Sequence, residues 1–314
     1  MAKILVVGEV LMDFIEVDRE LYAASIGGAP FNVGTNLARL GDKVTFIGQV
    51  GNDFFGEEVY DFVKKLENFD SKIETLNECN TTVALNAEDP NTHQRKFSFV
   101  RNNTADYKFN SDTLSNLDLS DFDLIHIGSL FLSKDESLPI IEEFLTKAKN
   151  EGKKISFDVN FRSDIFESVN EAISRYQKFI EMADFVKFSD EELKVFSLSE
   201  DKLLEMSKDK VIVVTNGSKG STLYINGKIY MHNAYRVKVF DTVGAGDSFY
   251  SGFLHTYLNS DKHDDNEYIN SLKFGNACGA LTCNKYGALS AYESEKEVLK
   301  FINRREKRKV AFNI

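Results

Sequence analysis

Cysteine is scarce in this sequence. The 314 residues include only three cysteines, Cys79, Cys278 and Cys283. An odd number of cysteines without C-x-x-C spacing argues against both a disulfide framework and a zinc site. Sparse, unpaired cysteines favour a reducing compartment, and we expect a cytoplasmic protein.

Long apolar runs are missing as well. No stretch reaches the roughly 18 apolar residues that a membrane helix needs. The apolar start MAKILVVGEVLM is interrupted by Glu9 and Asp13, and no small-residue cleavage site follows it cleanly. We therefore interpret this start as a buried first strand and expect no membrane partner.

Positive charge is in the minority. The formal net charge is −11 and the sequence pI is about 5.1. Such a chain repels a phosphate backbone, so nucleic acid is not an expected partner. The only dense basic run, RREKRK from Arg304 to Lys309, is interpreted as a solvated helix end.

Two common nucleotide-binding signatures are absent. The P-loop pattern GxxxxGK[ST] occurs nowhere in the chain. Fragments of the dinucleotide fingerprint GxGxxG occur, but they do not line up with the first strand, a helix and a later acid. The sequence therefore excludes a P-loop enzyme and argues against a dinucleotide-dependent oxidoreductase.

Strand-like apolar runs alternate with helical patterns through most of the chain. ILVVG, VTFIGQVG, DLIHIGS, KISFDVN, DFVKFS and VIVVTNG are each followed by a helical or turn-rich segment. Apolar strands separated by helices predict a parallel sheet covered on both faces. No linker or internal repeat interrupts the pattern, so we expect one domain over residues 1–314.

Two stretches break this rhythm and alternate in polarity like half-buried strands. They are LMDFIEV near the N-terminus and TVALNAEDPNTHQRKFSFV at 82–100. We expect strands from about 10–26 and 82–101 to form a small sheet projecting from the main one. LYINGKIY at 223–230 predicts a separate hairpin with Asn226-Gly227 as a type I′ turn.

The stretch FDTVGAGDSFYSGF, residues 240–253, places small residues and an acid where a strand becomes a helix. Backbone amides at a helix N-terminus attract anions, and small residues let a ligand approach them. The positive helix end favours the ionised form of Asp247, which then accepts a proton. Gly244, Ala245, Gly246 and Asp247 therefore suit a phosphoryl group attacked by a hydroxyl. The alternative is an Asp that only caps the helix.

Two motifs resemble one known family. FDTVGAGDSFYSGF is similar to the DTxGAGD signature of the ribokinase and fructokinase family of carbohydrate kinases, and GGAPFNVGTNLARLG at 27–41 resembles its N-terminal signature. The resemblance extends from Gly8 to Leu289. It implies a ribokinase-like three-layer α/β sandwich with a mostly parallel central sheet and a β-sheet lid. It also implies ATP as donor, Mg²⁺ as cofactor, a sugar as acceptor, and a homodimer formed through the lid.

The resemblance also implies a set of sugar-binding residues. A carboxylate and an amide can pair with neighbouring hydroxyls, and a guanidinium suits phosphate oxygens. The alternatives are an edge-strand acid for Asp13, a helix cap for Asn32, and surface salt bridges for the two arginines. The residues that match the family's substrate positions are Asp13, Gly27, Gly28, Asn32, Arg101 and Arg162.

Nucleotide and metal positions are carried over in the same way. Ser189 stands where the family often has Asn, as it does in fructokinase-like relatives, so direct phosphate contact there is open. The other nucleotide candidates are Thr215, Gly217, Gly220 and Asn276. The candidates around a hydrated magnesium are Asp158, Asn160 and Glu192, and those of a potassium site are Asp241, Val243 and Gly287.

Within the family, the chain is more similar to the fructokinases. Ala29 in GGAPFN stands where ribokinases commonly have Lys, and GEVLMDF and FDVNFR are also fructokinase-like. The resemblance implies conversion of fructose to fructose 6-phosphate. A 2-keto-3-deoxygluconate kinase is the alternative, because both arginines also suit a carboxylate. A ribokinase and a catalytically silent sugar-binding regulator are less favoured.

Overall fold

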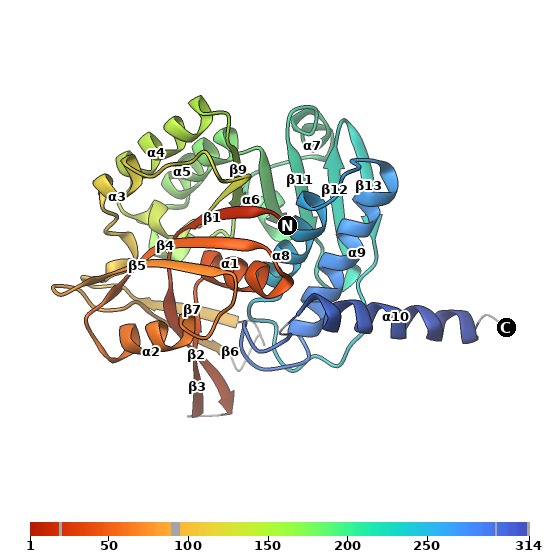
Figure 1. The fold of residues 1–314 in the computed structure, drawn as a ribbon, viewed down its shortest axis with the longest axis horizontal. Coiled ribbons are helices and arrows are strands. Elements are labelled where there is room, and N and C mark those ends of the chain that lie inside the picture. Colours follow the sequence, from red (N-terminus) through yellow and green to blue (C-terminus); the bar gives the residue numbers. More distant parts are fainter. Residues whose placement is uncertain (19–20, 89–94, 293, 313–314) are drawn as a thin grey trace. The chain divides into compact units, whose positions relative to one another are not determined.

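The computed structural model describes residues 1–18, 21–88, 95–292 and 294–312 (Figure 1). The chain divides into two compact units. Unit 1 comprises Met1–Ala2, Asn32–Lys43 and Phe185–Ile314, and unit 2 comprises Lys3–Phe31 and Val44–Asp184. Among the described residues, no helix is both long and apolar enough to cross a bilayer. The single domain expected from the sequence stays a prediction.

Unit 2 carries a sheet in the order β9-β8-β1-β4-β5. The pairs β1–β8, β8–β9 and β4–β5 are parallel, as the apolar strand pattern predicted. The helices α4 and α5 pack on β9. The strands are β1 (Lys3–Val7), β4 (Lys43–Gly51), β5 (Phe69–Leu76), β8 (Leu124–Ile127) and β9 (Lys154–Asp158). The helices are α2 (Phe54–Val63), α3 (Ser111–Ser115), α4 (Leu138–Asn150), α5 (Val169–Met182), η1 (Ala105–Tyr107), η2 (Leu130–Ser133) and η3 (Ser163–Ile165).

Strand β5 was not expected from the sequence. Its segment FDSKIETL buries only Ile73. The strand pairs with β4 alone and ends the sheet order, so its outer edge needs few apolar side chains. An edge strand of this composition has too weak a periodic signal to be recognised by its sequence.

A second sheet in unit 2 has the order β3-β2-β6-β7. Its strands are β2 (Leu11–Asp18), β3 (Leu21–Gly27), β6 (Val83–Glu88) and β7 (Arg95–Val100). Two antiparallel pairs, β2–β3 and β6–β7, are joined by a parallel β2–β6 pairing. The small sheet predicted from the two alternating stretches is therefore present. Residues 89–94, between β6 and β7, lie outside the described residues.

Unit 1 carries β10 (Phe185–Ser189), β11 (Val211–Thr215), β12 (Ser221–Ile225) and β13 (Lys228–His232). The pair β10–β11 is parallel, and β11–β12 and β12–β13 are antiparallel. Asn226 and Gly227 have φ of 53° and 69°, so the predicted type I′ turn is confirmed. The helices are α1 (Ala29–Leu40, from Asn32 onwards), α6 (Asp190–Val195), α7 (Glu200–Met206), η4 (Gly217–Lys219), α8 (Ala245–Leu258), α9 (Asp265–Thr282) and α10 (Glu295–Phe312).

The helices α8 and α9 lie side by side and in close contact (Figure 1). Glycines permit this approach: a Cβ built on Gly252 would lie 2.7 Å from Cys278 Sγ, and one on Gly275 would lie 2.7 Å from Phe249 O. Cys278 is fully buried in this contact, and burial raises the pKa of its thiol to about 12. Cys278 therefore acts as a packing residue, in agreement with the absence of a cysteine metal motif in the sequence.

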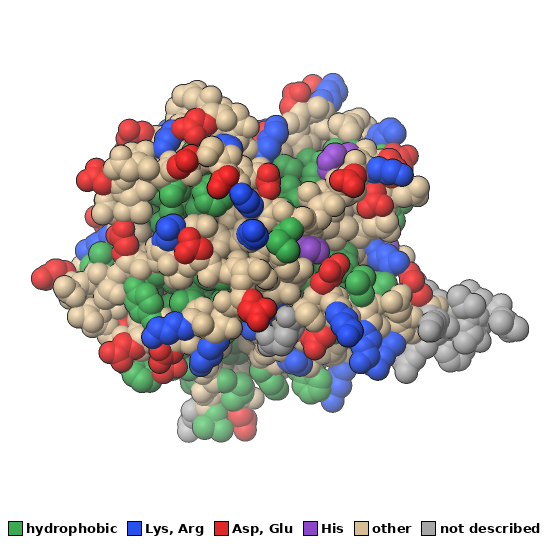
Figure 2. Space-filling model, viewed as in Figure 1, with side chains coloured by type: hydrophobic (Ala, Val, Ile, Leu, Met, Phe, Trp, Pro, Cys, Tyr) green, Lys and Arg blue, Asp and Glu red, His purple; other side chains and the backbone are tan. Residues whose placement is uncertain are grey.

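On the face shown in Figure 2, acidic and basic side chains are interspersed among uncharged ones. The basic run at 304–309 lies in the C-terminal part of α10, as expected of a helix end, and its solvated character stays a prediction.

Candidate active site

The N-terminus of α8 begins at a glycine that no other residue can easily replace. Gly244 is the N-cap and has a left-handed backbone, with φ of 73°. A Cβ at this position would lie 2.3 Å from Ala288 Cβ. Gly244 has no side chain to cap the first turn of α8. The amide of Ala245 donates to Thr242 O at 3.2 Å, so the other first-turn amides are the ones that can face an anion.

A carboxylate clamps the loop that leads into this turn. Asp241 is buried, and its two oxygens accept hydrogen bonds from Val243 N and Gly287 N, each at 3.0 Å. The three residues predicted for a potassium site are therefore close together. The structure gives Asp241 a second role. Its hydrogen bonds fix the backbone at Val243, just before Gly244, and at Gly287, next to the Ala288 that lies against Gly244.

Asp247 lies at the third position of α8, so it is not the N-cap residue. Its Oδ2 accepts a hydrogen bond of 2.7 Å from Asn32 Nδ2 on α1. The two helices also meet through Ser251, whose hydroxyl donates to Val33 O at 3.3 Å. The two signature motifs, far apart in the sequence, thus meet at the carboxylate that the sequence selected as catalytic.

Lys187 is a charged group at this turn that the sequence analysis missed. It lies on β10 with 6% of its surface exposed. A Cβ built on Gly246 would lie 3.5 Å from Lys187 Nζ, so the ammonium is next to the first turn of α8. The signal was present in FVKFS, because a lysine inside a buried apolar strand is rare without a specific role. Its charge adds to the attraction of the helix end for anions.

A pocket of about 600 Å³ opens beside this turn in unit 1. This volume lies in the range of small-molecule sites. Its walls include the catalytic candidates Ala245 and Gly246 and an apolar set that the sequence analysis missed: Val237, Val239, Phe249, Ala280 and Cys283. It also includes the predicted nucleotide residues Thr215, Gly217, Gly220 and Asn276. Ser189 does not line this pocket.

Two polar residues shape the pocket wall. Asn276 donates through Nδ2 to His232 O at 3.0 Å, which ties α9 to the end of β13. Tyr235 also lines the pocket, and burial, followed by the charge of Glu306, raises its pKa to about 12. Its phenol stays neutral at physiological pH and can face a flat uncharged ring system such as a base.

Unit 2 holds the predicted sugar residues Asp13, Gly27 and Gly28. Asp13 is buried on β2, and a Cβ built on Gly27 would lie 1.9 Å from its Oδ2. Gly28 has φ of 107°, and a Cβ there would lie 2.6 Å from Glu9 O. Both glycines are therefore required by the close approach of backbone and carboxylate.

Arg101 follows β7 and is almost fully buried in unit 2. Its guanidinium donates to Asp106 Oδ2 and to Ser133 Oγ, the latter at 2.6 Å, and lies over the ring of Tyr107. Asp106 also accepts from Thr82 and Thr104. The side chain is held in a fixed position, as a binding residue requires. Arg162 precedes η3, is half-buried and donates to Phe161 O.

The magnesium candidates divide between the two units. In unit 2, Asp158 is buried at the end of β9, and Asn160, with φ of 35°, follows it. In unit 1, Glu192 and Ser189 form the capping box of α6, which accounts for both residues locally. Among the described residues there is no group of three or more His, Cys, Asp or Glu side chains placed to hold a metal. Asp158 and Glu192 carry carboxylate oxygens, the ligand type that Mg²⁺ prefers, and a magnesium site at these residues stays a prediction.

Each unit thus carries its own part of the predicted site. In unit 1 the structure brings together Asn32, the turn 244–247, the potassium candidates and the pocket lined by the nucleotide candidates, called the nucleotide pocket below. In unit 2, Asp13 lies in the small sheet and Arg101 directly follows its strand β7. Asp13 pairs with Ala84, and Ala84 pairs with Phe99, two residues before Arg101.

The chemistry that the α8 turn suits is phosphoryl transfer to a hydroxyl: amides and Lys187 for the anion, and a carboxylate for the proton. Comparison with known proteins agrees. Residues 1–295 match the model of the pfkB family of carbohydrate kinases, and the chain belongs to this family.

Three similar proteins illustrate the relationship. A fructokinase of Vibrio alginolyticus is 29% identical, with 96% of this chain and 99% of that protein covered. A fructokinase mutant of Vibrio cholerae O395, crystallised with fructose, ADP and potassium, has a TM-score of 0.86 at 26% identity, covering 96% of this chain and 98% of that one. A Xylella fastidiosa fructokinase with bound ATP has a TM-score of 0.86 at 28% identity, covering 97% and 99%. The ribokinase-like α/β fold expected from the sequence, with a large mostly parallel sheet and a small second sheet, is confirmed.

Two glycines of the α8 turn are predicted to respond differently to alanine. At Gly246 the added Cβ meets only the end of Lys187, so Gly246→Ala should fold and gain up to about 1 kcal/mol of stability. Its methyl projects where an anion approaches, so kcat/KM for phosphoryl transfer should fall by about tenfold or more. Gly244→Ala should instead lose about 1–2 kcal/mol or more, from left-handed strain and contact with Ala288.

Thermal unfolding and steady-state ADP release of both variants measure these effects. A Gly246→Ala enzyme with normal turnover would show that the first-turn amides are not used by the transferred group.

Proposed function

We propose that the protein is an ATP-dependent fructokinase, which transfers the γ-phosphoryl group of ATP to fructose and forms fructose 6-phosphate. The observation that carries the proposal is the Asp247–Asn32 hydrogen bond, in the first turn of α8 and in the same unit as a pocket of nucleotide size. The names of the similar fructokinases, and the fructose, ADP and ATP in their crystal structures, support it.

In the proposed reaction Asp247 accepts the proton of the attacking sugar hydroxyl. Asn32 keeps the carboxylate oriented through its 2.7 Å hydrogen bond, and so sets which oxygen faces the substrate. The amides at Gly244–Gly246 and the ammonium of Lys187 stabilise the negative charge on the transferred group. The base of ATP lies against the apolar wall of the pocket, near Tyr235 and Phe249.

Sugar hydroxyls are assigned to Asp13 and to the backbone at Gly27 and Gly28, with Arg101 and Arg162 as further substrate contacts. Asp158 and Asn160, with Glu192, are the groups proposed to hold a hydrated Mg²⁺, which when bound would neutralise phosphate charge. Ser189, the N-cap residue of α6, remains a candidate for contact with the nucleotide. Asp241, Val243 and Gly287 are proposed to hold a potassium ion, which the Vibrio cholerae relative binds. A cytoplasmic location stays a prediction from the cysteine content.

The second candidate is a 2-keto-3-deoxygluconate kinase, in which an arginine would meet a carboxylate. The environment of Arg101 argues against it. Its charge is already balanced by the buried Asp106, which removes much of its attraction for a second carboxylate. A neutral ketohexose is bound through hydrogen bonds and needs no unbalanced positive charge. The Arg101 site therefore suits fructose better than 2-keto-3-deoxygluconate.

A substrate screen tests the proposal directly. We expect ADP release to have its highest kcat/KM with fructose among fructose, ribose, 2-keto-3-deoxygluconate, glucose, tagatose and nucleosides. A clear preference for 2-keto-3-deoxygluconate would replace the fructokinase assignment with the second candidate.

The same assay, run in potassium and in a bulky organic cation at matched ionic strength, tests the potassium site. We expect faster turnover in potassium.

The role of Asp247 is tested by Asp247→Asn, which keeps the size of the side chain and an acceptor for Asn32. The amide cannot take the hydroxyl proton, so kcat should fall by about 10²- to 10⁴-fold with little change in fructose affinity or thermal stability. Asp201→Asn is the matched control, because Asp201 is an exposed acid in the first turn of α7. Near-normal turnover of Asp247→Asn would assign the carboxylate a structural role.

The small sheet of unit 2 is proposed to act as a lid, because Asp13 and Gly27 lie on its own strands β2 and β3. A homodimer formed through this sheet is part of the proposal, and its exposed Leu21, Tyr22 and Val100 support it. We expect saturating fructose to slow amide hydrogen exchange in 11–18 and 83–88. Unchanged exchange in both segments would contradict lid closure.

A further inference from the structure

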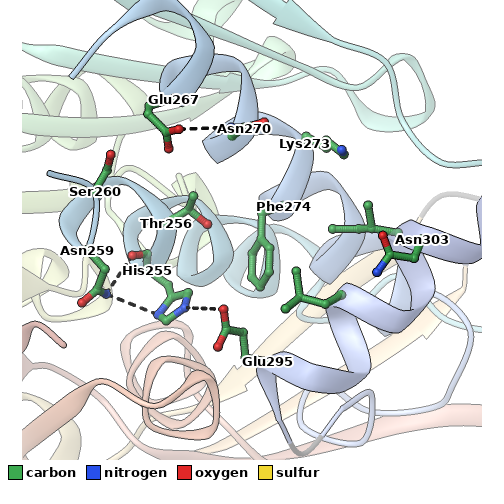
Figure 3. A pocket seen from close by; sticks show the side chains of 12 residues that line it. His255, Thr256, Asn259, Ser260, Glu267, Asn270, Lys273, Phe274, Glu295 and Asn303 are labelled. Atoms are coloured by element: carbon green, nitrogen blue, oxygen red, sulfur yellow. Dashed lines mark hydrogen bonds and ion pairs between the residues drawn. The ribbon is translucent and has the colours of Figure 1, made fainter. Parts of the chain in front are cut away.

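A second pocket in unit 1, of about 380 Å³, lies among α8, α9 and α10 (Figure 3). It shares no lining residue with the nucleotide pocket. Thr256 in its wall is on the order of 18 Å along α8 from Gly244, at a rise of about 1.5 Å per residue. The pocket is therefore distinct from the candidate active site. Its lining residues are His255, Thr256, Asn259, Ser260, Glu267, Asn270, Lys273, Phe274, Glu295, Leu299, Ile302 and Asn303.

One wall of this pocket is apolar. Phe274 from α9 stands in the middle of the view in Figure 3, and Leu299 and Ile302 from α10 complete the wall. Phe274 and Ile302 are buried in the cluster between the two helices, while Leu299 is 42% exposed. An apolar wall of this kind accommodates the hydrocarbon part of a ligand.

A carboxylate lies on each side of this wall. Figure 3 shows Glu267 and Glu295 on opposite sides of Phe274. Glu267 accepts a hydrogen bond of 3.3 Å from Asn270, and Glu295 is half-exposed, with Oε1 3.7 Å from His255 Nε2. Glu267 and Glu295 lie in the first turns of α9 and α10, whose positive ends offset part of their charge, whereas the C-terminal end of α8 at His255–Leu258 contributes partial negative charge.

The positive groups of the pocket are balanced by other acids. Lys273 forms an ion pair with Glu306. His255 donates through Nδ1 to the fully buried Asp42 at 2.7 Å, and Asp42 also accepts from Asn259 and Ala2 N. A protonated His255 would therefore have its charge balanced by Asp42. Glu267 and Glu295 leave the pocket with a net negative character.

We propose that this pocket binds an aliphatic diamine. Each ammonium group meets one carboxylate, Glu267 or Glu295, and the methylene chain between them lies along Phe274, Leu299 and Ile302. The hydroxyls and amides of Thr256, Ser260 and Asn303 accept the remaining ammonium hydrogens. A phosphate does not fit this charge pattern, since the anion would face both carboxylates.

The binding test uses putrescine as the probe, with n-butylamine and butanediol as comparison ligands, by calorimetry on the full chain at low ionic strength. We expect saturable binding of putrescine, several-fold weaker binding of n-butylamine, and the weakest binding of butanediol. Added salt should weaken putrescine most, because both contacts are ionic.

Variants connect the binding to the two carboxylates. Glu267→Gln keeps an acceptor for Asn270, and Glu295→Gln changes only the charge, so each should fold and weaken putrescine by about two- to fivefold, and the double variant by about tenfold or more. Glu205→Gln is the matched control, because it removes an exposed carboxylate of α7 in the same unit and should leave putrescine binding unchanged. Circular dichroism confirms the fold of each variant.

The proposal is overturned if the wild-type chain shows no saturable binding of putrescine, or if the double variant binds it as the wild type does. Butanediol binding as tightly as putrescine would assign the pocket to neutral polyols instead. Because these readouts do not use turnover, they are independent of whether the enzyme phosphorylates fructose.

Discussion

The hydrogen bond between Asn32 and Asp247 is the interaction on which the rest of the candidate site depends. It joins two parallel helices of unit 1 near their N-termini, and the Asp42–His255 pair joins α8 to the residues just after α1 at the opposite end. A carboxylate in a first helical turn is free to rotate toward solvent or toward nearby amides. The amide of Asn32 fixes one oxygen, so the carboxylate has a defined direction before any ligand arrives.

The glycines between α8 and α9 extend this constraint to the nucleotide pocket. Without side chains at Gly252 and Gly275, α9 can approach α8 closely enough for Phe249 and Gly279 to belong to the same pocket wall. The second pocket lies against the other halves of the same two helices. The same closely packed helix pair therefore forms part of the wall of both pockets.

The α8 turn combines positive groups with one negative group, and their roles in the proposed reaction are complementary. The first-turn amides and the buried Lys187 create a positive surrounding, which alone would hold an anion without reaction. Asp247 lies within that surrounding, and in the proposed reaction its carboxylate accepts the proton. The left-handed Gly244 and the hydrogen bonds of Asp241 hold the backbone of this turn, so in the proposed reaction its amides are already oriented toward the phosphoryl group.

Sequence periodicity alone determined much of the architecture. The buried strands, the Asn226-Gly227 hairpin, the small sheet and the glycine-led helix at 244 could all be predicted, because apolar period and turn chemistry are local properties of the chain. The glycine turn at 244–247 was also selected from its own residues, and its catalytic role stays a prediction. The weak edge strand β5 was not found, because its sequence carries only one buried side chain.

Only the tertiary structure decided which residues meet. Lys187 and Gly246 are far apart in the chain, and so are Asp42 and His255, and no local pattern reports that folding places them together. The apolar wall of the nucleotide pocket comes from α8, α9 and the segment after β13, whose side chains look like ordinary core residues in the sequence. Local propensity is written in neighbouring residues, whereas a site is made by contacts between distant ones, and these form only when the helices pack.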